Sequence, residues 1–351
     1  MSKLVQVGYA CVNVTLTNRP KHQGDRVTTS RGLRKASWHP TFDLHKIGDI
    51  AVANARDLLT YLQWNEAANI RLFRLGSELI PWHDHFALTD LPQYDELSDA
   101  LRIAGIYAKQ HGHRITTHPG PYHVLGSPSQ AVVDKTIIGL ERHSETFDLM
   151  GFEPSFHNKI NIHIGGCYGD HAGTAKRWIS NWRMLSPECR ARLVVENDDK
   201  ASMFSVLQLH ELFYRDIGIP ITFDYFHHTF HTSGLSEREA LELAGETWPA
   251  DVVQCTHYSE SRRDEYSLEL RTMCEAQGIS FDQLPDWPTF AAMYSQYQKI
   301  KVTAHSDYVV NPINSYGRRI DVILEAKAKE LAVLRYKVRH ERSNTVEMLL
   351  V

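Results

Sequence analysis

The chain has 351 residues, of which 42% are hydrophobic and 23% are charged, and its formal net charge at pH 7 is −4. These values are ordinary for a folded globular protein, and no tract is of low complexity. The sequence has no apolar run long enough to cross a bilayer and no N-terminal signal-peptide pattern, so we expect a cytoplasmic or nucleoid-associated protein without membrane contacts. Its five cysteines are scattered without a CxxC pair, which indicates reduced thiols rather than disulfides or a zinc knuckle.

Short β-branched segments alternate with longer amphipathic segments along most of the chain, as in repeated βα units. In chain order the expected elements are strand 4–8, helix 47–65, strand 70–75, helix 95–110, strand 114–117, helix 130–150, strand 160–164, helix 175–185, strand 193–195, helix 203–217, strand 221–223, helix 237–247, strand 252–255, strand 321–324 and helix 326–336. Eight strands alternating with helices predict a (β/α)₈ TIM barrel. The alternative, a doubly wound open sheet, lacks a GxGxxG motif after the first strand.

Three regions interrupt this regular alternation. Residues 15–40 form a long basic and polar loop, and residues 261–314 form a second excursion with helical pieces at 268–276 and 287–298. The first is too long for a routine connection, so it is either a functional loop or a partly mobile one. We expect a single monomeric barrel domain over residues 1–336, followed by a C-terminal extension over residues 337–351.

Histidine, glutamate or aspartate ends six consecutive predicted strands, from the third to the eighth. These residues are His118, His163, Glu196, Asp224 (with His227 three residues later), His257 and Glu325. The C-terminal ends of barrel strands surround one cavity, where TIM-barrel enzymes place their active sites. One such histidine alone is more often structural, but burying several carboxylates and imidazoles together without a counter-charge costs several kcal/mol per group. Divalent metal ions remove that cost, so the pattern favours a site for two or three metal ions.

The donor set mixes imidazoles and carboxylates without thiolate. Such ligands suit Mn²⁺, which we favour, with Zn²⁺, Mg²⁺ or Fe²⁺ as alternatives. Glu196 lies between the two groups of ligands and is the natural bridging carboxylate. Paired metals can activate a water and stabilise the attacking and leaving oxygens of a phosphodiester displacement, so no side-chain nucleophile is required.

Seven short motifs at successive strand ends match a known family. They are Gly8-Tyr9-Ala10-Cys11-Val12-Asn13, Phe73-Arg74-Leu75-Gly76 with Leu79-Ile80-Pro81, Thr117-His118-Pro119-Gly120, His163-Ile164-Gly165-Gly166, Val195-Glu196-Asn197-Asp198, Phe223-Asp224 with His227-His228, and Leu324-Glu325-Ala326-Lys327-Ala328-Lys329. Over residues 4–331 the chain resembles the UV damage endonuclease family, TIM-barrel relatives of endonuclease IV. One motif is weak evidence, whereas seven in the right order are specific.

The resemblance implies roles for particular residues. It implies one metal held by His118, His163 and Glu196, a second held by Glu196, Asp224, His257 and Glu325, a third held by His227 and His305, a further active-site histidine at His85, and DNA-contacting residues at Tyr9, Asn13, Pro121 and Tyr122. Two positions depart from the family pattern. Pro121 stands where a glutamine often precedes the tyrosine that probes damaged bases, and Cys255 stands where a lysine often precedes the seventh-strand histidine.

The resemblance also implies an activity, namely incision of double-stranded DNA immediately 5′ to cyclobutane pyrimidine dimers and 6-4 products, leaving a 3′-hydroxyl. The damaged nucleotides are expected to flip out of the stack. Basic loop residues are candidates for phosphate contacts, although a solvated surface loop explains them equally well: Arg19, Lys21, Arg26, Arg31, Arg34 and Lys35. Two alternatives stay open, an abasic-site endonuclease of the endonuclease IV type and a xylose-isomerase-like sugar isomerase or epimerase.

Overall fold

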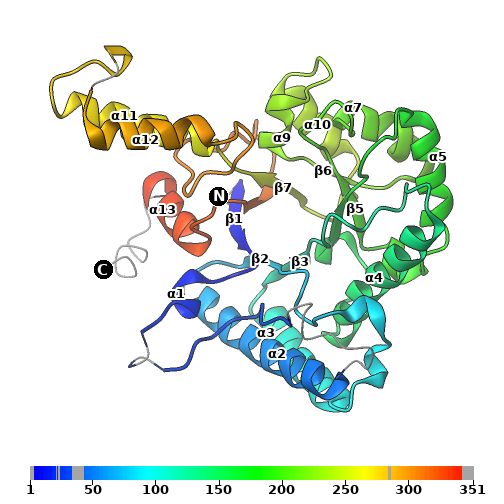
Figure 1. The fold of residues 1–351 in the computed structure, drawn as a ribbon. Coiled ribbons are helices and arrows are strands. Elements are labelled where there is room, and N and C mark those ends of the chain that lie inside the picture. The colour runs from blue at the N-terminus through cyan, green and yellow to red at the C-terminus, as the bar shows by residue number, and fades with distance from the viewer. Residues whose placement is uncertain (1–3, 21, 23, 34–42, 284–285, 342–351) are drawn as a thin grey trace.

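The computed structural model describes residues 4–20, 22, 24–33, 43–283 and 286–341. Eight parallel strands form one sheet in the order β6-β5-β4-β3-β2-β1-β8-β7. Their bounds are β1 Val5–Ala10, β2 Leu72–Leu75, β3 Arg114–Thr117, β4 Ile160–His163, β5 Leu193–Glu196, β6 Ile221–Thr222, β7 Gln254–Tyr258 and β8 Ile320–Leu324. The strands surround a central axis and helices surround the strands (Figure 1). The predicted TIM barrel is therefore confirmed.

The barrel closes in two different ways. On one side β1 pairs with both β2 and β8. On the other side β6 has only two residues, and an isolated parallel bridge from Asp224 to His257 joins the segment after β6 to β7. Since both bridge partners are predicted metal ligands, the last contact of the sheet also holds part of the candidate site in place.

The helices connect successive strands around the outside. Their bounds are α1 Val14–Thr17, α2 Leu44–Ala67, α3 Tyr94–Gln110, α4 Gln130–Leu149, α5 His171–Trp182, α6 Pro187–Arg190, α7 Val206–Leu209, α8 Arg215–Ile217, α9 Tyr225–Phe230, α10 Glu237–Glu246, α11 Arg262–Glu275, α12 Pro288–Lys299 and α13 Glu330–Glu341. Short 3₁₀ helices add η3 His83–His85, η4 Leu88–Asp90, η5 Phe156–Asn158 and η7 Phe281–Gln283, and η6 His210–Tyr214 is a π-helix. None of the described helices has the length and apolarity that a bilayer crossing requires.

Several predicted boundaries differ from those in the structure. Strand seven begins at Gln254 rather than 252 and contains His257. The last helix begins at Glu330 rather than 326, because Lys329 has a φ of 55° that an α-helix cannot include. That helix ends at Glu341, within the predicted C-terminal extension, and residues 342–351 lie outside the described residues.

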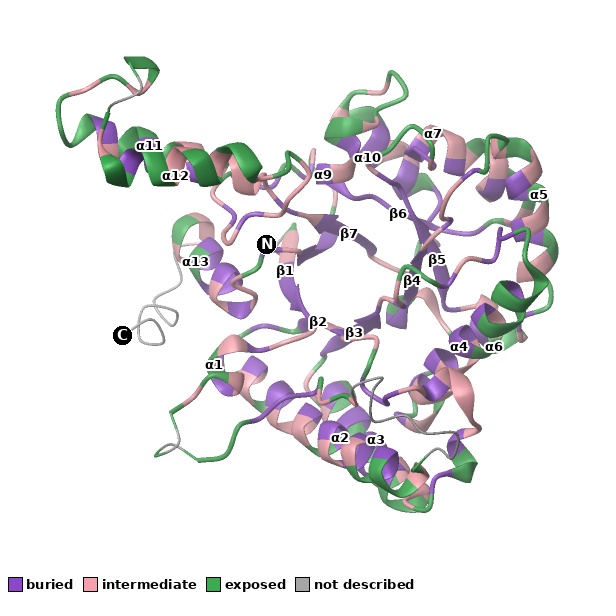
Figure 2. Ribbon diagram, in the orientation of Figure 1, coloured by how far each residue is buried: buried purple, intermediate pink, exposed green. Residues whose placement is uncertain are grey.

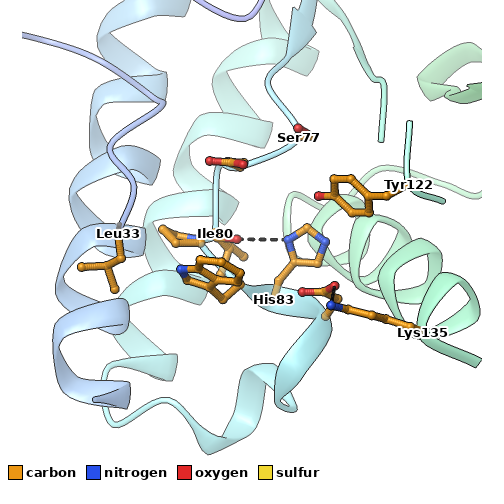
Figure 3. Close-up of a pocket in the computed structure, with 10 residues that line it drawn as sticks. Leu33, Ser77, Ile80, His83, Tyr122 and Lys135 are labelled. Carbon is orange, nitrogen blue, oxygen red and sulfur yellow. Dashed lines mark hydrogen bonds and ion pairs between the residues drawn. The ribbon is translucent and has the colours of Figure 1, made fainter. Parts of the chain in front are cut away.

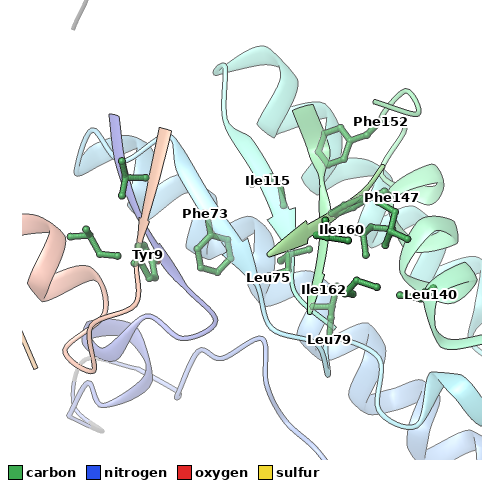
Figure 4. Close-up of a cluster of buried hydrophobic side chains, with 14 of the residues drawn as sticks. Tyr9, Phe73, Leu75, Leu79, Ile115, Leu140, Phe147, Phe152, Ile160 and Ile162 are labelled. Carbon is green, nitrogen blue, oxygen red and sulfur yellow. The ribbon is translucent and has the colours of Figure 1, made fainter. Parts of the chain in front are cut away.

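The main core lies between the strands and the helices that surround them. Apolar side chains from the strands meet those of the surrounding helices, as Figure 4 shows for Phe73 on β2 and Ile160 on β4. Most strand residues are buried, whereas the outer faces of the helices are exposed (Figure 2). The α11–α12 pair projects from the barrel and has its own apolar cluster, which includes Tyr266 and Phe290 (Figure 1).

The barrel interior is polar at both ends. At the N-terminal end, the guanidinium of Arg114 donates to Asp321 Oδ2 at 2.8 Å and to the carbonyl of His157 at 2.7 Å. Buried charges persist in proteins only when they are paired and hydrogen-bonded. The same requirement applies at the C-terminal mouth, where carboxylates are in excess.

Candidate metal centre

The strand ends place the predicted ligands at one rim of the barrel. His163 and Glu196 are the last residues of β4 and β5 and are direct register partners across the two strands. Asp224 ends the β6 segment as the N-cap of α9, and its Oδ1 accepts a hydrogen bond from the backbone N–H of His227 at 2.7 Å. Because all strands are parallel and in adjacent register, these side chains meet although they are far apart in sequence.

Glu196 belongs to two groups of metal-ligand side chains. His118, His163 and Glu196 each offer one ligand atom within 4.8 Å of the others. His118 Nε2 lies 3.2 Å and His163 Nε2 lies 3.7 Å from Glu196 Oε2. In the second group, Glu196, Asp224, His257 and Glu325 meet the same limit. The two groups therefore share the carboxylate of Glu196, and a bridging role for it stays a prediction.

The second group is buried more deeply. His257 Nδ1 lies 2.9 Å from Glu196 Oε1 and 3.3 Å from Glu325 Oε1. Asp224 Oδ2 and His257 Nε2 are buried and have no hydrogen-bond partner among the described residues. Buried polar atoms in folded proteins nearly always have a partner. The unpartnered Asp224 oxygen and the His257 Nδ1 that faces Glu196 are the donor types that divalent ions prefer, so the residues fit a metal centre.

The charge balance of the protein without metal also fits a metal centre. Burial lowers the pKa of His163, but the carboxylates of Glu196 and Asp198 outweigh that effect and raise it to about 10. Similarly, burial is outweighed at His227 by Asp224 and Glu196, which raise the pKa to about 9. Burial raises the pKa of Asp224 to about 7. Protons thus supply the positive charge that metal ions would otherwise supply.

Metal binding at this centre should therefore release protons. Histidine ligates metals only as neutral imidazole, and His163 and His227 hold their protons up to about pH 10 and 9. Because protons compete with metal for these nitrogens, metal affinity should increase as the pH rises from neutral toward 9. We expect Mn²⁺ titration calorimetry in buffers of different ionisation enthalpy to show release of about one proton from His163 near neutral pH, part of a proton from Asp224, and a further proton from His227 when a third ion binds. A pH-independent affinity without proton release would contradict this charge assignment.

Three other predicted ligands, His227, His305 and His85, lie outside these two groups. His227 Nδ1 lies 3.7 Å from Glu196 Oε1 and 2.9 Å from the carbonyl of Asn197. His305 Nδ1 lies 3.8 Å from Glu325 Oε2, and the His305 and His227 rings are 6.3 Å apart. His85 lies further off, in η3, with Nε2 3.0 Å from Lys135 Nζ. Neither His85 nor this histidine pair belongs to a ligand group found among the described residues.

The four predicted DNA-contacting residues lie in two different environments. Pro121 and Tyr122 are exposed on the loop after β3, and Tyr122 retains 55% of its accessible surface. By contrast, Tyr9 and Asn13 are fully buried. The Tyr9 hydroxyl donates to Asn65 Oδ1 at 2.8 Å and accepts from Asn13 Nδ2 at 3.1 Å. In this structure Tyr9 packs beside Phe73 in the core (Figure 4), and DNA contact by this buried pair stays a prediction.

Three further residues, without a role predicted from the sequence, support the centre. Arg74 on β2 forms an ion pair with Glu325, and Asn161 on β4 donates to Glu196 Oε2. Lys159 is completely buried below them and donates to Thr222 Oγ1 at 2.6 Å and to Asn161 Oδ1 at 3.2 Å. Lys159, Asn161 and His163 alternate along one segment, which is the period of side chains on one face of a strand. That alternation is the sequence signal that could have indicated that Lys159 and Asn161 face the barrel interior together with His163.

The departure from the family pattern at Cys255 has a local structural setting. The carbonyl of Cys255 on β7 lies 3.4 Å from Lys159 Nζ, so an ammonium group from β4 approaches this position of the barrel. Burial lowers the pKa of Lys159 to about 8. In the basic loop, Arg31 pairs with Asp57 of α2 at 2.6 Å, whereas Lys21, Arg34 and Lys35 lie outside the described residues.

Comparison with known proteins adds independent information. The family model described as UV-endonuclease UvdE matches residues 5–348. A UV-damage endonuclease of Neurospora crassa is 36% identical over 296 residues, which cover 73% of this chain and only 44% of that longer protein. A UV DNA damage endonuclease of Clostridium perfringens is 32% identical over 338 residues, which cover 95% of this chain and 76% of that protein.

Solved structures agree with these matches. The crystal structure of SacUVDE has a TM-score of 0.72 at 28% identity and covers 96% of this chain and 99% of its own. Endonuclease IV from Thermus thermophilus has a TM-score of 0.50 at 12% identity, covers 82% of this chain and 96% of its own, and shares the fold. The resemblance inferred from the strand-end motifs is thus confirmed, and the chain belongs to the UV-endonuclease UvdE family.

Proposed function

We propose that this protein is a metal-dependent endodeoxyribonuclease that nicks duplex DNA immediately 5′ to cyclobutane pyrimidine dimers and 6-4 products, leaving a 3′-hydroxyl. The observation that carries the proposal is the pair of ligand groups sharing Glu196 at the barrel mouth. The names of the relatives, which describe endonucleases for UV-damaged DNA, supply the substrate class.

The centre would hold two or three divalent ions, with Mn²⁺ favoured. His118, His163 and Glu196 would hold one, and Glu196, Asp224, His257 and Glu325 a second, while His227 and His305 are candidates for a third. When bound, such ions supply Lewis acidity that lowers the pKa of an attacking water and offsets charge on the phosphate. No side-chain nucleophile is needed.

The protein's own residues orient this centre. Asn161 donates to Glu196, and Arg74 holds Glu325 by an ion pair. Asp198 Oδ1 lies 2.9 Å from His163 Nδ1, which leaves His163 Nε2 directed at Glu196. Carboxylates and carbonyls that bind the second ring nitrogen fix the orientation of a ligating histidine. These contacts make the centre rigid before DNA binds.

Two cavities lie beside the exposed loop after β3. A cavity of about 230 Å³ is lined by Pro121 together with His118 and His163 of the centre. A second cavity, of about 310 Å³, is lined by Tyr122, Trp82 and Lys135, and Figure 3 shows Tyr122 and Lys135 around it. We propose that Tyr122 stacks into the duplex where the damaged bases have left it, because exposed aromatic rings stack on bases without regard to sequence.

The decisive test is cleavage of an end-labelled duplex. Three substrates are compared, containing one thymine dimer, one abasic site or no damage, after chelation and again after Mn²⁺ is added back. We expect a single cut immediately 5′ to the dimer that requires added metal, and extension by a polymerase would identify the 3′-hydroxyl. Cutting at the abasic site alone would favour the endonuclease IV type of activity. Interconversion of ketoses and aldoses without DNA cleavage would favour the isomerase.

Substitution of Tyr122 tests the probing role. Stacking on an aromatic side chain contributes about 1–3 kcal/mol per base, so Tyr122→Ala should reduce the preference for damaged over undamaged duplex by about tenfold or more. The measurement is competition binding with both duplexes. Tyr107→Ala is the control, because Tyr107 stacks on His111 at the end of α3. Equal loss of affinity for both duplexes in Tyr122→Ala would reject a damage-specific role.

A further inference from the structure

Three buried histidines form a separate cluster beside the mouth. His83 lies in η3, His123 in the loop after β3 and His143 in α4, and each offers a ring nitrogen within 4.8 Å of the others. Their exposures are 8%, 3% and 7%. The His83 and His143 rings meet edge to face at 4.7 Å between centroids. None of the three belongs to the groups around Glu196, so this cluster is distinct from the candidate metal centre.

Hydrogen bonds fix the tautomer of two of the rings. His83 Nδ1 lies 3.0 Å from the carbonyl oxygen of Ile80, and His123 Nδ1 lies 3.1 Å from the carbonyl oxygen of Gly120. A carbonyl only accepts, so both Nδ1 atoms must carry the proton and each Nε2 keeps a free lone pair. Figure 3 shows His83 held through this bond, with Tyr122 and Lys135 nearby.

The remaining nitrogens are unpartnered. The Nε2 atoms of His83, His123 and His143 are all buried and have no hydrogen-bond partner within the described part of the chain. Burial lowers the pKa of each ring, to about 4 for His123, so the cluster is neutral at physiological pH. The free lone pairs of His83 and His123 and the unpartnered Nε2 of His143 come together from three segments, and a cation between them would give each nitrogen a partner.

We propose that His83, His123 and His143 form a zinc site that fastens the loop carrying Tyr122 to α4 and to η3. Imidazole-only donors favour Zn²⁺ over the oxygen-preferring ions, and three histidines with a fourth, open position are an established zinc arrangement. The Nδ1–H bonds to backbone carbonyls are those that commonly orient zinc-bound histidines. The carboxylate of Asp84 interacts electrostatically with His83 and His123, and it also pairs with Lys135 at 3.2 Å.

The position of the site explains what the ion would do. Only residues 119–122 separate His123 from His118, so the short loop between β3 and the cluster would be held at both ends when both sites are filled. His143 lies one helical turn after Gly139. A Cβ atom at position 139 would lie 2.2 Å from His123 Nε2, which is too close for any side chain. Glycine at that position lets the His123 ring lie against α4 beside His143.

Zinc content tests the site without any DNA substrate, so the result is independent of the proposed function. The full chain carrying Glu196→Gln, which weakens the main centre, is stripped with chelator, reloaded with Zn²⁺, dialysed against a weak competitor and analysed by mass spectrometry. We expect about one retained equivalent, lost when His123→Gln or His143→Gln is added. His45→Gln is the matched control, because His45 is exposed on α2. Equal zinc content in all these variants would overturn the proposal.

A second measurement uses the unsubstituted chain, so its result does not depend on whether the variants fold. Crystals of the unsubstituted chain grown with Zn²⁺ are measured on both sides of the zinc absorption edge. An anomalous peak between the three Nε2 atoms supports the site. Its absence, with the three rings packed directly against one another, would overturn it.

Discussion

Glu196→Gln should lower the rate of DNA incision at saturating Mn²⁺ by about 10³-fold or more while changing affinity for damaged duplex only a few-fold. Glu196 is fully buried, and its oxygens lie within 3.2 Å of both His118 Nε2 and His257 Nδ1. Glutamine keeps the size of the side chain but removes the negative charge shared by both ligand groups. Loss of several kcal/mol of metal-derived stabilisation corresponds to this decrease in rate.

Single-turnover cleavage of the dimer-containing duplex and a parallel binding titration provide the two readouts. The matched control is Glu188→Gln, in which an exposed glutamate of α6 receives the same change. Metal content measured on the same samples distinguishes loss of ions from misfolding, which circular dichroism would detect. Retention of wild-type turnover by Glu196→Gln would rule out a bridging role for this carboxylate.

Arg74→Met should destabilise the metal-free protein by about 3 kcal/mol, and added Mn²⁺ should recover part of that loss. The Arg74–Glu325 pair retains only 11% and 16% side-chain exposure, and removing one partner of a buried pair commonly costs about 3–5 kcal/mol. The lower figure applies because some solvent reaches both groups. Without Arg74, Glu325 lies near Glu196 with one fewer fixed positive charge, and bound ions would replace it.

Urea unfolding with chelator and with saturating Mn²⁺ measures both parts of this prediction. The double variant Arg74→Met/Glu325→Gln should be less destabilised than the sum of the single variants, because it also removes the Glu325 charge that Arg74→Met leaves without its arginine partner. Arg102→Met is the control, since the Arg102–Asp99 pair is 57% and 67% exposed and should contribute less than about 1 kcal/mol. If Arg74→Met destabilised the protein equally with and without metal, Arg74 would not be compensating charge at the metal centre.

Much of the site could be predicted because parallel barrels obey a simple rule. A residue that directly follows a buried strand segment must lie at the C-terminal mouth, whatever the loops do. His118, His163, Glu196 and Asp224 satisfy that rule, and small errors in strand boundaries did not move them away from the rim. Residues on loops were less predictable: His85 matches a family motif but lies beside Lys135.

The direction of side chains inside strands was harder to infer. Arg74, Lys159 and Asn161 are strong hydrogen-bonding groups in or beside strands, and a sequence alone does not say whether such groups face the barrel interior or the helices. A shift of one residue reverses that choice. Tyr9 and Asn13 show the same limit, because their positions near the end of strand one did not indicate that they bond to each other or that Tyr9 also bonds to Asn65.

From the sequence by itself follow the eight-strand architecture, the histidines and carboxylates at the strand ends and the family, since each depends on local periodicity or on residues next to a strand. Only the tertiary structure brought His83, His123 and His143 together. These histidines come from a 3₁₀ helix, a loop and an α-helix that share no common period. Their convergence depends on how η3 and the loop after β3 pack on α4, which is decided by the shape of the whole core rather than by any local pattern.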